Sequence, residues 1–113
     1  MPEILAPNGL WIFKNDLYEV DFSSGILYKI NLKTKSISKV AEALGGGDGL
    51  VKSGDNFFVS DWKNGKIYKV QGNKVSLFKD GFRAAADIAL SFDKKSIITP
   101  DMKAGSVTIV PIH

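Results

Sequence analysis

The residues of this chain that could carry chemistry are oxygen donors. The sequence has no cysteine and a single histidine, His113, at its end, which excludes thiolate chemistry, histidine clusters and Ser-His-Asp catalysis. Two oxygen-bearing side chains begin similar segments 40 residues apart, Asn8 in Asn-Gly-Leu and Asp48 in Asp-Gly-Leu. Amide and carboxylate oxygens are hard ligands suited to Ca²⁺, Mg²⁺ or Mn²⁺. These ions take about six oxygens or more, so further ligands are needed, and Asp87, where a third such segment begins, is the next candidate.

A structural interpretation of these residues stands beside the metal-site hypothesis. Asn8 and Asp48 would then each lie at the end of an inner strand and hydrogen-bond a turn, while Gly9 and Gly49 would allow close packing near an axis. The glycines at 45–47 lack the Lys-Ser/Thr of a phosphate loop and precede a predicted strand, so nucleotide binding is not favoured there. The residue types alone leave the metal-site and structural interpretations open.

The elements that position these residues form an internal repeat. Asp21, Asp61 and Asp101 are 40 residues apart, and in each copy a glycine follows the aspartate four residues later. A fixed period of about 20–50 residues indicates a repeat architecture. The copies span approximately 8–47, 48–86 and 87–113. The recurring aspartates are predicted to accept backbone N–H groups in the turn that follows each of them.

Each copy contains short segments with strand character. A run dense in β-branched and aromatic residues, such as 57–62, is followed by a run that alternates apolar and polar residues, such as 65–70. An inner strand precedes this pair, and in the first two copies an outer strand follows it. Four short strands per unit of about 40 residues predict an all-β fold of three β-propeller blades. The competing interpretation is a short helix over 38–44, ended by the glycines, but the matching strand of the second copy favours a strand.

Three blades cannot close a propeller ring, which has about 4–8 of them. An open arc would expose apolar blade faces and sheet edges. We therefore expect half of a six-bladed propeller, completed either by a second copy in a homodimer or by a missing N-terminal half. The third copy lacks its fourth strand, and residues 1–7 are predicted to act as the closing strand. Aromatic residues at matching repeat positions are predicted to lie in the core between blades rather than to form a ligand platform: Trp11, Phe22, Tyr28, Phe58, Trp62 and Tyr68.

The inner-strand openings 7–10 and 47–50 resemble signatures of the senescence marker protein, gluconolactonase and luciferin-regenerating enzyme family, and the segments 58–62 and 65–70 resemble its second and third blade strands. The resemblance spans nearly the whole chain and implies the C-terminal three blades of a six-bladed propeller. Metal-dependent members hold a divalent ion at the channel mouth through a glutamate, two asparagines and an aspartate. The resemblance assigns one of those asparagines to Asn8.

The same resemblance assigns the aspartate, which also serves as the acid/base, to Asp48, while the glutamate and the second asparagine belong to blades that the resemblance does not place in this chain. One hypothesis is therefore a metal-assisted hydrolase module of the sugar-lactonase type, in which the metal polarises the lactone carbonyl and Asp48 activates water or relays its proton. The other is a non-catalytic module that binds a small molecule or a partner at the channel mouth. Fold alone does not decide between them, and the missing ligands favour the second for a single chain.

Composition narrows the classes of partner. The formal net charge is +3, and lysines are spread through every segment, which indicates a solvated surface rather than a nucleic-acid site. No stretch approaches the roughly 18 apolar residues of a membrane helix, and charged residues interrupt the first 20 residues, unlike a signal peptide. We therefore expect no nucleic-acid or membrane partner, and a cytoplasmic location by default.

Overall fold

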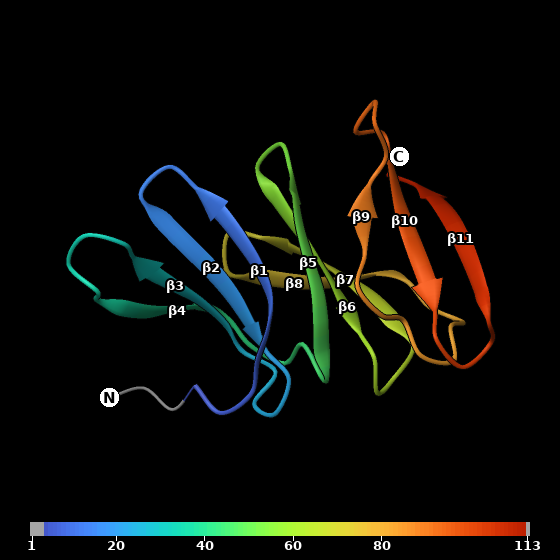
Figure 1. The fold of residues 1–113 in the computed structure, drawn as a ribbon, viewed down its shortest axis with the longest axis horizontal. Coiled ribbons are helices and arrows are strands. Elements are labelled where there is room, and N and C mark those ends of the chain that lie inside the picture. Colours follow the sequence, from blue (N-terminus) through green and yellow to red (C-terminus); the bar gives the residue numbers. More distant parts are fainter. Residues whose placement is uncertain (1–3, 113) are drawn as a thin grey trace.

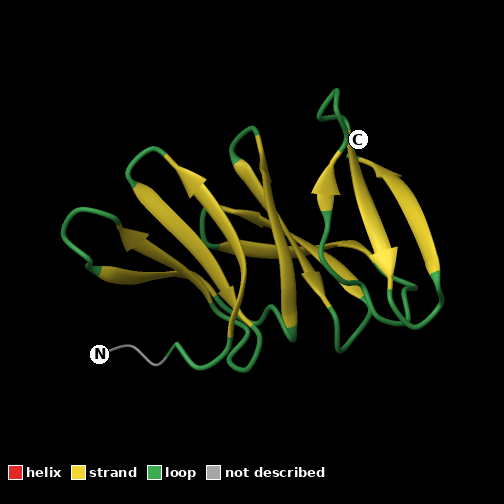
Figure 2. Ribbon diagram, in the orientation of Figure 1, coloured by secondary structure: helices red, strands yellow, loops and turns green. Residues whose placement is uncertain are grey.

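The chain folds into three antiparallel sheets that stand side by side in sequence order (Figure 1). The computed structural model describes residues 4–112, and over that range it contains strands and loops but no helix (Figure 2). Accordingly, no helix of the described chain could cross a membrane. The strands are β1 Pro7–Phe13, β2 Asp16–Asp21, β3 Leu27–Asn31, β4 Ile37–Ala41, β5 Gly47–Ser53, β6 Asn56–Asp61, β7 Lys66–Gln71, β8 Lys74–Lys79, β9 Ala89–Leu90, β10 Ser96–Asp101 and β11 Ser106–Pro111.

Each sheet is a meander in which strands that follow one another in the chain pair with one another. The strand orders are β1-β2-β3-β4 (blade 1), β5-β6-β7-β8 (blade 2) and β9-β10-β11 (blade 3). This is the strand arrangement of propeller blades, and the prediction of an all-β, blade-like repeat is confirmed. The alternative helix over 38–44 does not form, because Ile37–Ala41 pairs with β3 and a loop follows.

The recurring aspartates hold consecutive blades together. Asp61 is buried at the end of β6, and its side chain accepts the main-chain N–H of Gly46, in the loop that leaves blade 1, at 2.8 Å. Asp101 does the same for the N–H groups of Arg83 at 2.8 Å and Ala84 at 2.9 Å, in the loop that leaves blade 2. Each aspartate also accepts an N–H group of its own turn, as predicted. The carboxylates therefore stabilise both the local turn and the connection between blades.

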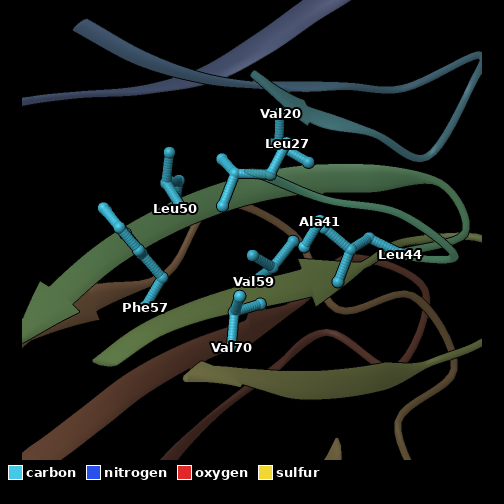
Figure 3. Close-up of a cluster of buried hydrophobic side chains, with 8 residues drawn as sticks. All are labelled: Val20, Leu27, Ala41, Leu44, Leu50, Phe57, Val59 and Val70. Carbon is cyan, nitrogen blue, oxygen red and sulfur yellow. The ribbon is translucent and has the colours of Figure 1, made fainter. Parts of the chain in front are cut away.

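Apolar side chains fill the space between the blades. The cluster between blades 1 and 2 comprises Val20, Leu27, Ala41, Leu44, Leu50, Phe57, Val59 and Val70 (Figure 3). The cluster between blades 2 and 3 comprises Val51, Phe58, Ile67, Ile88 and Ile97. Trp11 packs against both clusters, and the rings of Tyr18 and Phe57 lie 4.6 Å apart between their centroids.

The aromatic residues singled out from the sequence divide into two groups. Phe58 and Tyr28 are buried, and Trp11 and Tyr68 pack against the core. Phe22 and Trp62 also link neighbouring blades, but in the loops after β2 and β6, where their ring centroids are 6.3 Å apart. The prediction of packing between blades thus describes most of this set.

Residues 4–6, part of the closing strand predicted for 1–7, pair with no strand of the described structure. The N–H groups of Leu5 and Ala6 bind the Asp21 carboxylate at 3.0 and 2.6 Å, which is the arrangement of Gly46 with Asp61. Residues 4–6 therefore form the loop that precedes an inner strand, and Pro7 already belongs to β1. Residues 1–3 lie outside the described range. Among residues 4–112, no strand pairs with the outer edge of β11 in blade 3.

Substitution of the glycine that follows the aspartate tests how closely neighbouring blades are packed. Gly65 has a φ of +65°, and a Cβ there would overlap the carbonyl oxygen of Phe82. Gly72 has a nearly equal φ of +64°, but no atom lies within 4 Å of a Cβ placed there. We expect Gly72→Ala to cost only the strain of the left-handed conformation, about 1–2 kcal/mol. Gly65→Ala should cost several kcal/mol, because the loop must also move.

Urea unfolding of the two variants and the wild type measures the loss of unfolding free energy in each variant. The comparison uses one common value for the dependence of that free energy on urea concentration. Equal losses in the two variants would mean that the loop at Phe82 does not press on Gly65.

Candidate functional site

The three predicted site residues lie at one end of the inner strands. Asn8 is in β1, Asp48 is in β5, and Asp87 lies just ahead of β9. The inner strands contact one another in the order β1, β5, β9 and occupy the same place in each blade (Figure 1). We call the end marked by Asn8, Asp48 and Asp87 the inner rim. Asp48 is half-buried there, whereas Asn8 and Asp87 are exposed.

Two glycines allow the inner strands to approach. A Cβ on Gly9 would lie 2.9 Å from the main-chain nitrogen of Leu50, and one on Gly49 would lie 3.0 Å from the Cα of Asp87. No side chain larger than hydrogen fits at either place without a shift of the backbone. The structural interpretation of these glycines is therefore correct, and it brings Asp48 and Asp87 to the same part of the rim.

Asp87 does not occupy the third copy of the Asp48 position. Gly47 pairs with Asp61, and the corresponding bridge in blade 3 joins Ala85 to Asp101. The residue after Ala85 is Ala86, so Ala86 is the counterpart of Asp48, and Asp87 is the counterpart of Gly49. The turn between β7 and β8 is two residues shorter than the turn between β3 and β4, which moves the register ahead of the inner strand of blade 3. The predicted inner strand over 87–92 is correspondingly reduced to β9, Ala89–Leu90.

A hydroxyl group that sequence reasoning missed fixes the relation of these segments. The Ser60 Oγ accepts the N–H of Gly49 at 2.7 Å and donates to the carbonyl of Ala86 at 2.6 Å. Ser60 is fully buried, so both bonds are shielded from water. The repeat offered a signal: the matching positions of the other copies hold Val20 and Pro100, which makes a serine there exceptional.

The rim carries uncompensated negative charge. Burial raises the pKa of the Asp48 carboxyl, and the nearby charge of Asp87 raises it further. The ion pair within residues 4–112 joins Lys39 to Glu42, away from the rim, and no ion pair of that range involves Asp48 or Asp87. The electrostatics therefore favour a ligand that brings positive charge or hydrogen-bond donors to these two carboxylates.

The donor chemistry of the rim suits a hard cation, but the donor number of one chain is small. Two carboxylates and the Asn8 amide are the ligands that it can offer. Within the described residues, no group of three or more His, Cys, Asp or Glu side chains is close enough to hold a metal ion. Since Ca²⁺ or Mn²⁺ takes about six oxygens, water or another chain must provide the remainder.

A separate hollow lies at the other end of the same inner strands. It has a volume of about 210 Å³, and its lining includes Trp11, Phe13, Lys52 and Leu90. The Lys52 Nζ lies 4.1 Å from the centroid of the Phe13 ring, a cation–π contact. This end is aromatic and basic, so it differs in chemistry from the acidic rim.

The most unusual buried group is a carboxyl that the sequence analysis did not select. Glu19, in β2, is only 2% exposed, and neither of its side-chain oxygens has a hydrogen-bond partner within residues 4–112. Burial raises its pKa from 4.5 to about 7, and the charge of Asp21 adds to the rise. The corresponding residues of the other copies are Val59 and Thr99. A glutamate at a position that otherwise holds uncharged residues was the signal that the repeat offered.

Comparison with known proteins supports the blade fold. No protein-family model matches the sequence, and no curated protein sequence matches it. Among solved structures, the computationally designed Ika4 protein matches with a TM-score of 0.70 at 12% identity, covering 95% of this chain and 66% of that protein. A streptogramin B lyase matches with a TM-score of 0.68 at 10% identity, covering 92% of this chain and 40% of the lyase.

The computationally designed Ika8 protein also matches, with a TM-score of 0.68 at 13% identity, covering 94% of this chain and 33% of that protein. The chain thus spans less than two thirds of the length of each of these neighbours. At such low identity the likeness shows the fold alone. The same three-sheet unit therefore occurs within proteins of different total length.

The titration of Glu19 predicts how stability depends on pH. Between pH 4.5 and about 7 the unfolded chain loses this proton while the folded chain keeps it. The free energy of unfolding should therefore fall by on the order of 1–3 kcal/mol as pH rises through that window. Above the window it should no longer change because of this group. Asp21 and Asp101 have lowered pKa values, so their stabilising effect is lost only at more acidic pH.

Urea unfolding at a series of pH values, compared between the wild type and Glu19→Gln, isolates this group. The difference in unfolding free energy between the two should change across the window, and Glu19→Val, which copies the second repeat, should be more stable than the wild type at pH 8. Glu42→Gln, at an exposed glutamate, is the control and should leave the pH profile unchanged. A wild-type profile parallel to that of Glu19→Gln would show that Glu19 is ionised at neutral pH.

Proposed function

We propose that this chain is a β-propeller module that binds a small cationic ligand at the inner rim and is not catalytic by itself. The observation that carries the proposal is the pair of rim carboxylates, Asp48 and Asp87, which face no cationic side chain in an ion pair of the described residues. A bound cation, most simply a divalent metal ion, would reduce the repulsion between two like charges that the backbone holds close together. Gly49 and Ser60 hold that backbone in place.

The assignment as a binding module rests on the number of ligands. Asn8, Asp48 and Asp87 provide a partial set, so an ion bound by one chain keeps much of its hydration shell and is held weakly. The sequence has no cysteine, and among residues 4–112 there is no histidine to serve as a second acid/base at the rim. The resemblance to the lactonase family supports the same conclusion, since the glutamate and second asparagine of its metal site have no counterpart in this chain.

The alternative function is a divalent-metal-dependent sugar-lactone hydrolase, reached when other blades complete the ring. A metal at the rim would supply Lewis-acid chemistry toward a lactone carbonyl. Asp48 would be the acid/base, and its raised pKa favours that role because the shift brings the pKa closer to neutral pH. The Asp87 charge would tune that pKa, and Ser60 would hold the strand that carries Asp48.

Calorimetric titration with CaCl₂ and with MnCl₂ tests the proposal. We expect weak binding, with a dissociation constant of about 10⁻⁴–10⁻³ M. Asp48→Asn should weaken it at least tenfold, because it removes the half-buried charge, and Asp87→Asn should weaken it less. Asp55→Asn, at an exposed aspartate in the turn after β5, is the matched control and should bind as the wild type does.

Heat of binding that is absent, or that persists unchanged in both rim variants, would contradict the proposal. Hydrolysis of a sugar lactone that requires both the metal and Asp48 would instead establish the alternative function.

A further inference from the structure

The two outer blades each present an uncovered apolar face. On blade 1, the face turned away from blade 2 carries the apolar side chains of Leu10, Ile12, Leu17 and Ile30, which we call the blade 1 end face. The buried Glu19 lies on the same side of the sheet. On blade 3, the face turned away from blade 2 carries Ile98, Pro100, Val107 and Ile109, which we call the blade 3 end face. These groups follow from the strand register, because residues paired across neighbouring strands point to the same side of a sheet.

The repeat provides a direct comparison for these end faces. Leu10 is 57% exposed, whereas its counterpart in blade 2, Leu50, is 4% exposed beneath blade 1. Val107 is 66% exposed, whereas its counterpart Ile67 is 0% exposed beneath blade 3. These two positions of the repeat are therefore buried where a neighbouring blade exists and open where none does. Each end face has the side chains of an interface between blades but lacks the neighbour.

The two internal interfaces use the same pairs of positions. Leu27 and Leu50 share the cluster between blades 1 and 2, and Ile67 and Ile88 share the cluster between blades 2 and 3. The next pair in this series, one repeat further along, would join Val107 of one copy to Leu10 of another. Tyr18 with Phe57, and Phe58 with Ile97, form a second recurring pair, which continues as Ile98 with Leu17.

A main-chain hydrogen bond recurs in the same way. The Gly25 carbonyl accepts the N–H of Leu44 at 2.9 Å, and the Gly65 carbonyl accepts the N–H of Phe82 at 3.1 Å. The loop that donates each bond fills the space beside the glycine. Gly105 is the third such glycine, and no atom of the described residues lies within 4 Å of a Cβ placed there. By the register of the loops, the donor that fits this place is Ile4 of a second copy.

We propose that a second copy of this chain covers both end faces, with the blade 3 end face of each copy packed on the blade 1 end face of the other. Propellers have about 4–8 blades, and six is the multiple of three within that range, so two copies close the ring. The two seams are equivalent under a twofold axis, which is the commonest symmetry of soluble homo-oligomers. The ring closes by packing of faces and without strand exchange, because residues 4–6 remain in their loop.

Ring closure also completes the inner rim. Twofold symmetry places a second set of Asn8, Asp48 and Asp87 at the same end of the channel, which doubles the oxygen donors available there. The proposal goes beyond the ligand binding proposed above and does not depend on it, since the exposed side chains that meet at the seam are apolar and pack without a ligand. The oligomeric state can therefore be measured with chelator present.

Sedimentation equilibrium and light scattering at micromolar concentration, with EDTA in the buffer, test the proposal. We expect the wild type to be a dimer. Leu10→Asp, on the blade 1 end face, and Val107→Lys, on the blade 3 end face, should each shift the chain to monomer, with the dissociation constant raised at least tenfold. Leu77→Asp is the control, because Leu77 is an exposed strand residue of blade 2, whose two faces are already covered, and it should remain dimeric.

Mixing the two charged variants provides the sharper measurement. One seam then joins the aspartate variant of blade 1 to the lysine variant of blade 3, and the other seam is unchanged, so an equimolar mixture should recover the dimer. Leu10→Ser and Val107→Ser, which add no charge, should weaken the dimer without unfolding the chain, as circular dichroism will show. A folded wild-type monomer, or a dimer unaffected by both end-face substitutions, would overturn the proposal and leave a different protein as the occupant of these faces.

Discussion

A buried carboxylate at the end of each central strand organises the whole chain. Asp21, Asp61 and Asp101 each accept main-chain N–H groups from the loop that enters their blade and from the turn that follows. Each such loop leads directly into an inner strand, so the carboxylate sets where that strand begins. Hydrogen bonds to an ionised group out of contact with water are strong, so this connection holds the apolar faces of neighbouring blades in register. The packing clusters and the rim both depend on it.

The chemistry of the rim follows from a small departure from this regularity. The turn between β7 and β8 is two residues shorter than the turn between β3 and β4, so the residues that enter blade 3 come two positions earlier than the 40-residue period places them. Asp87 therefore takes the place of a glycine and lies near Asp48, while Ala86 holds the position that matches Asp48. Ser60 stabilises this arrangement with two short hydrogen bonds. A pair of adjacent carboxylates is thus the product of an imperfect third repeat.

Most of the fold could be predicted from the sequence, because strands, turns and the aspartate–glycine period can each be recognised from a short stretch of residues. The register of Asp87 was not predictable, since the shorter β7–β8 turn displaces it from the 40-residue period and the bridge from Ala85 to Asp101 reveals the shift. Residues 4–6 look like a strand in sequence, yet they bind Asp21 as a loop, because tertiary hydrogen bonds outweigh β propensity. Glu19 lies in a run dense in apolar residues that predicts a buried strand, but the sequence does not show that its carboxyl is buried without a partner, because that depends on how the elements around it pack.

The two proposals are linked through electrostatics. Closing the ring would gather two copies of Asp48 and Asp87 at one mouth, and their mutual repulsion opposes association in the absence of a cation. The apolar end faces supply the opposing free energy, since burial of exposed side chains such as Leu10 and Val107 favours the dimer. A cation bound between the rims would reduce the repulsion, so it would tighten the dimer, and the dimer would bind the cation more tightly by the same factor. The ratio of the dimer dissociation constants measured with and without calcium gives the size of this coupling. If the two constants are equal, the two rims are too far apart to share an ion.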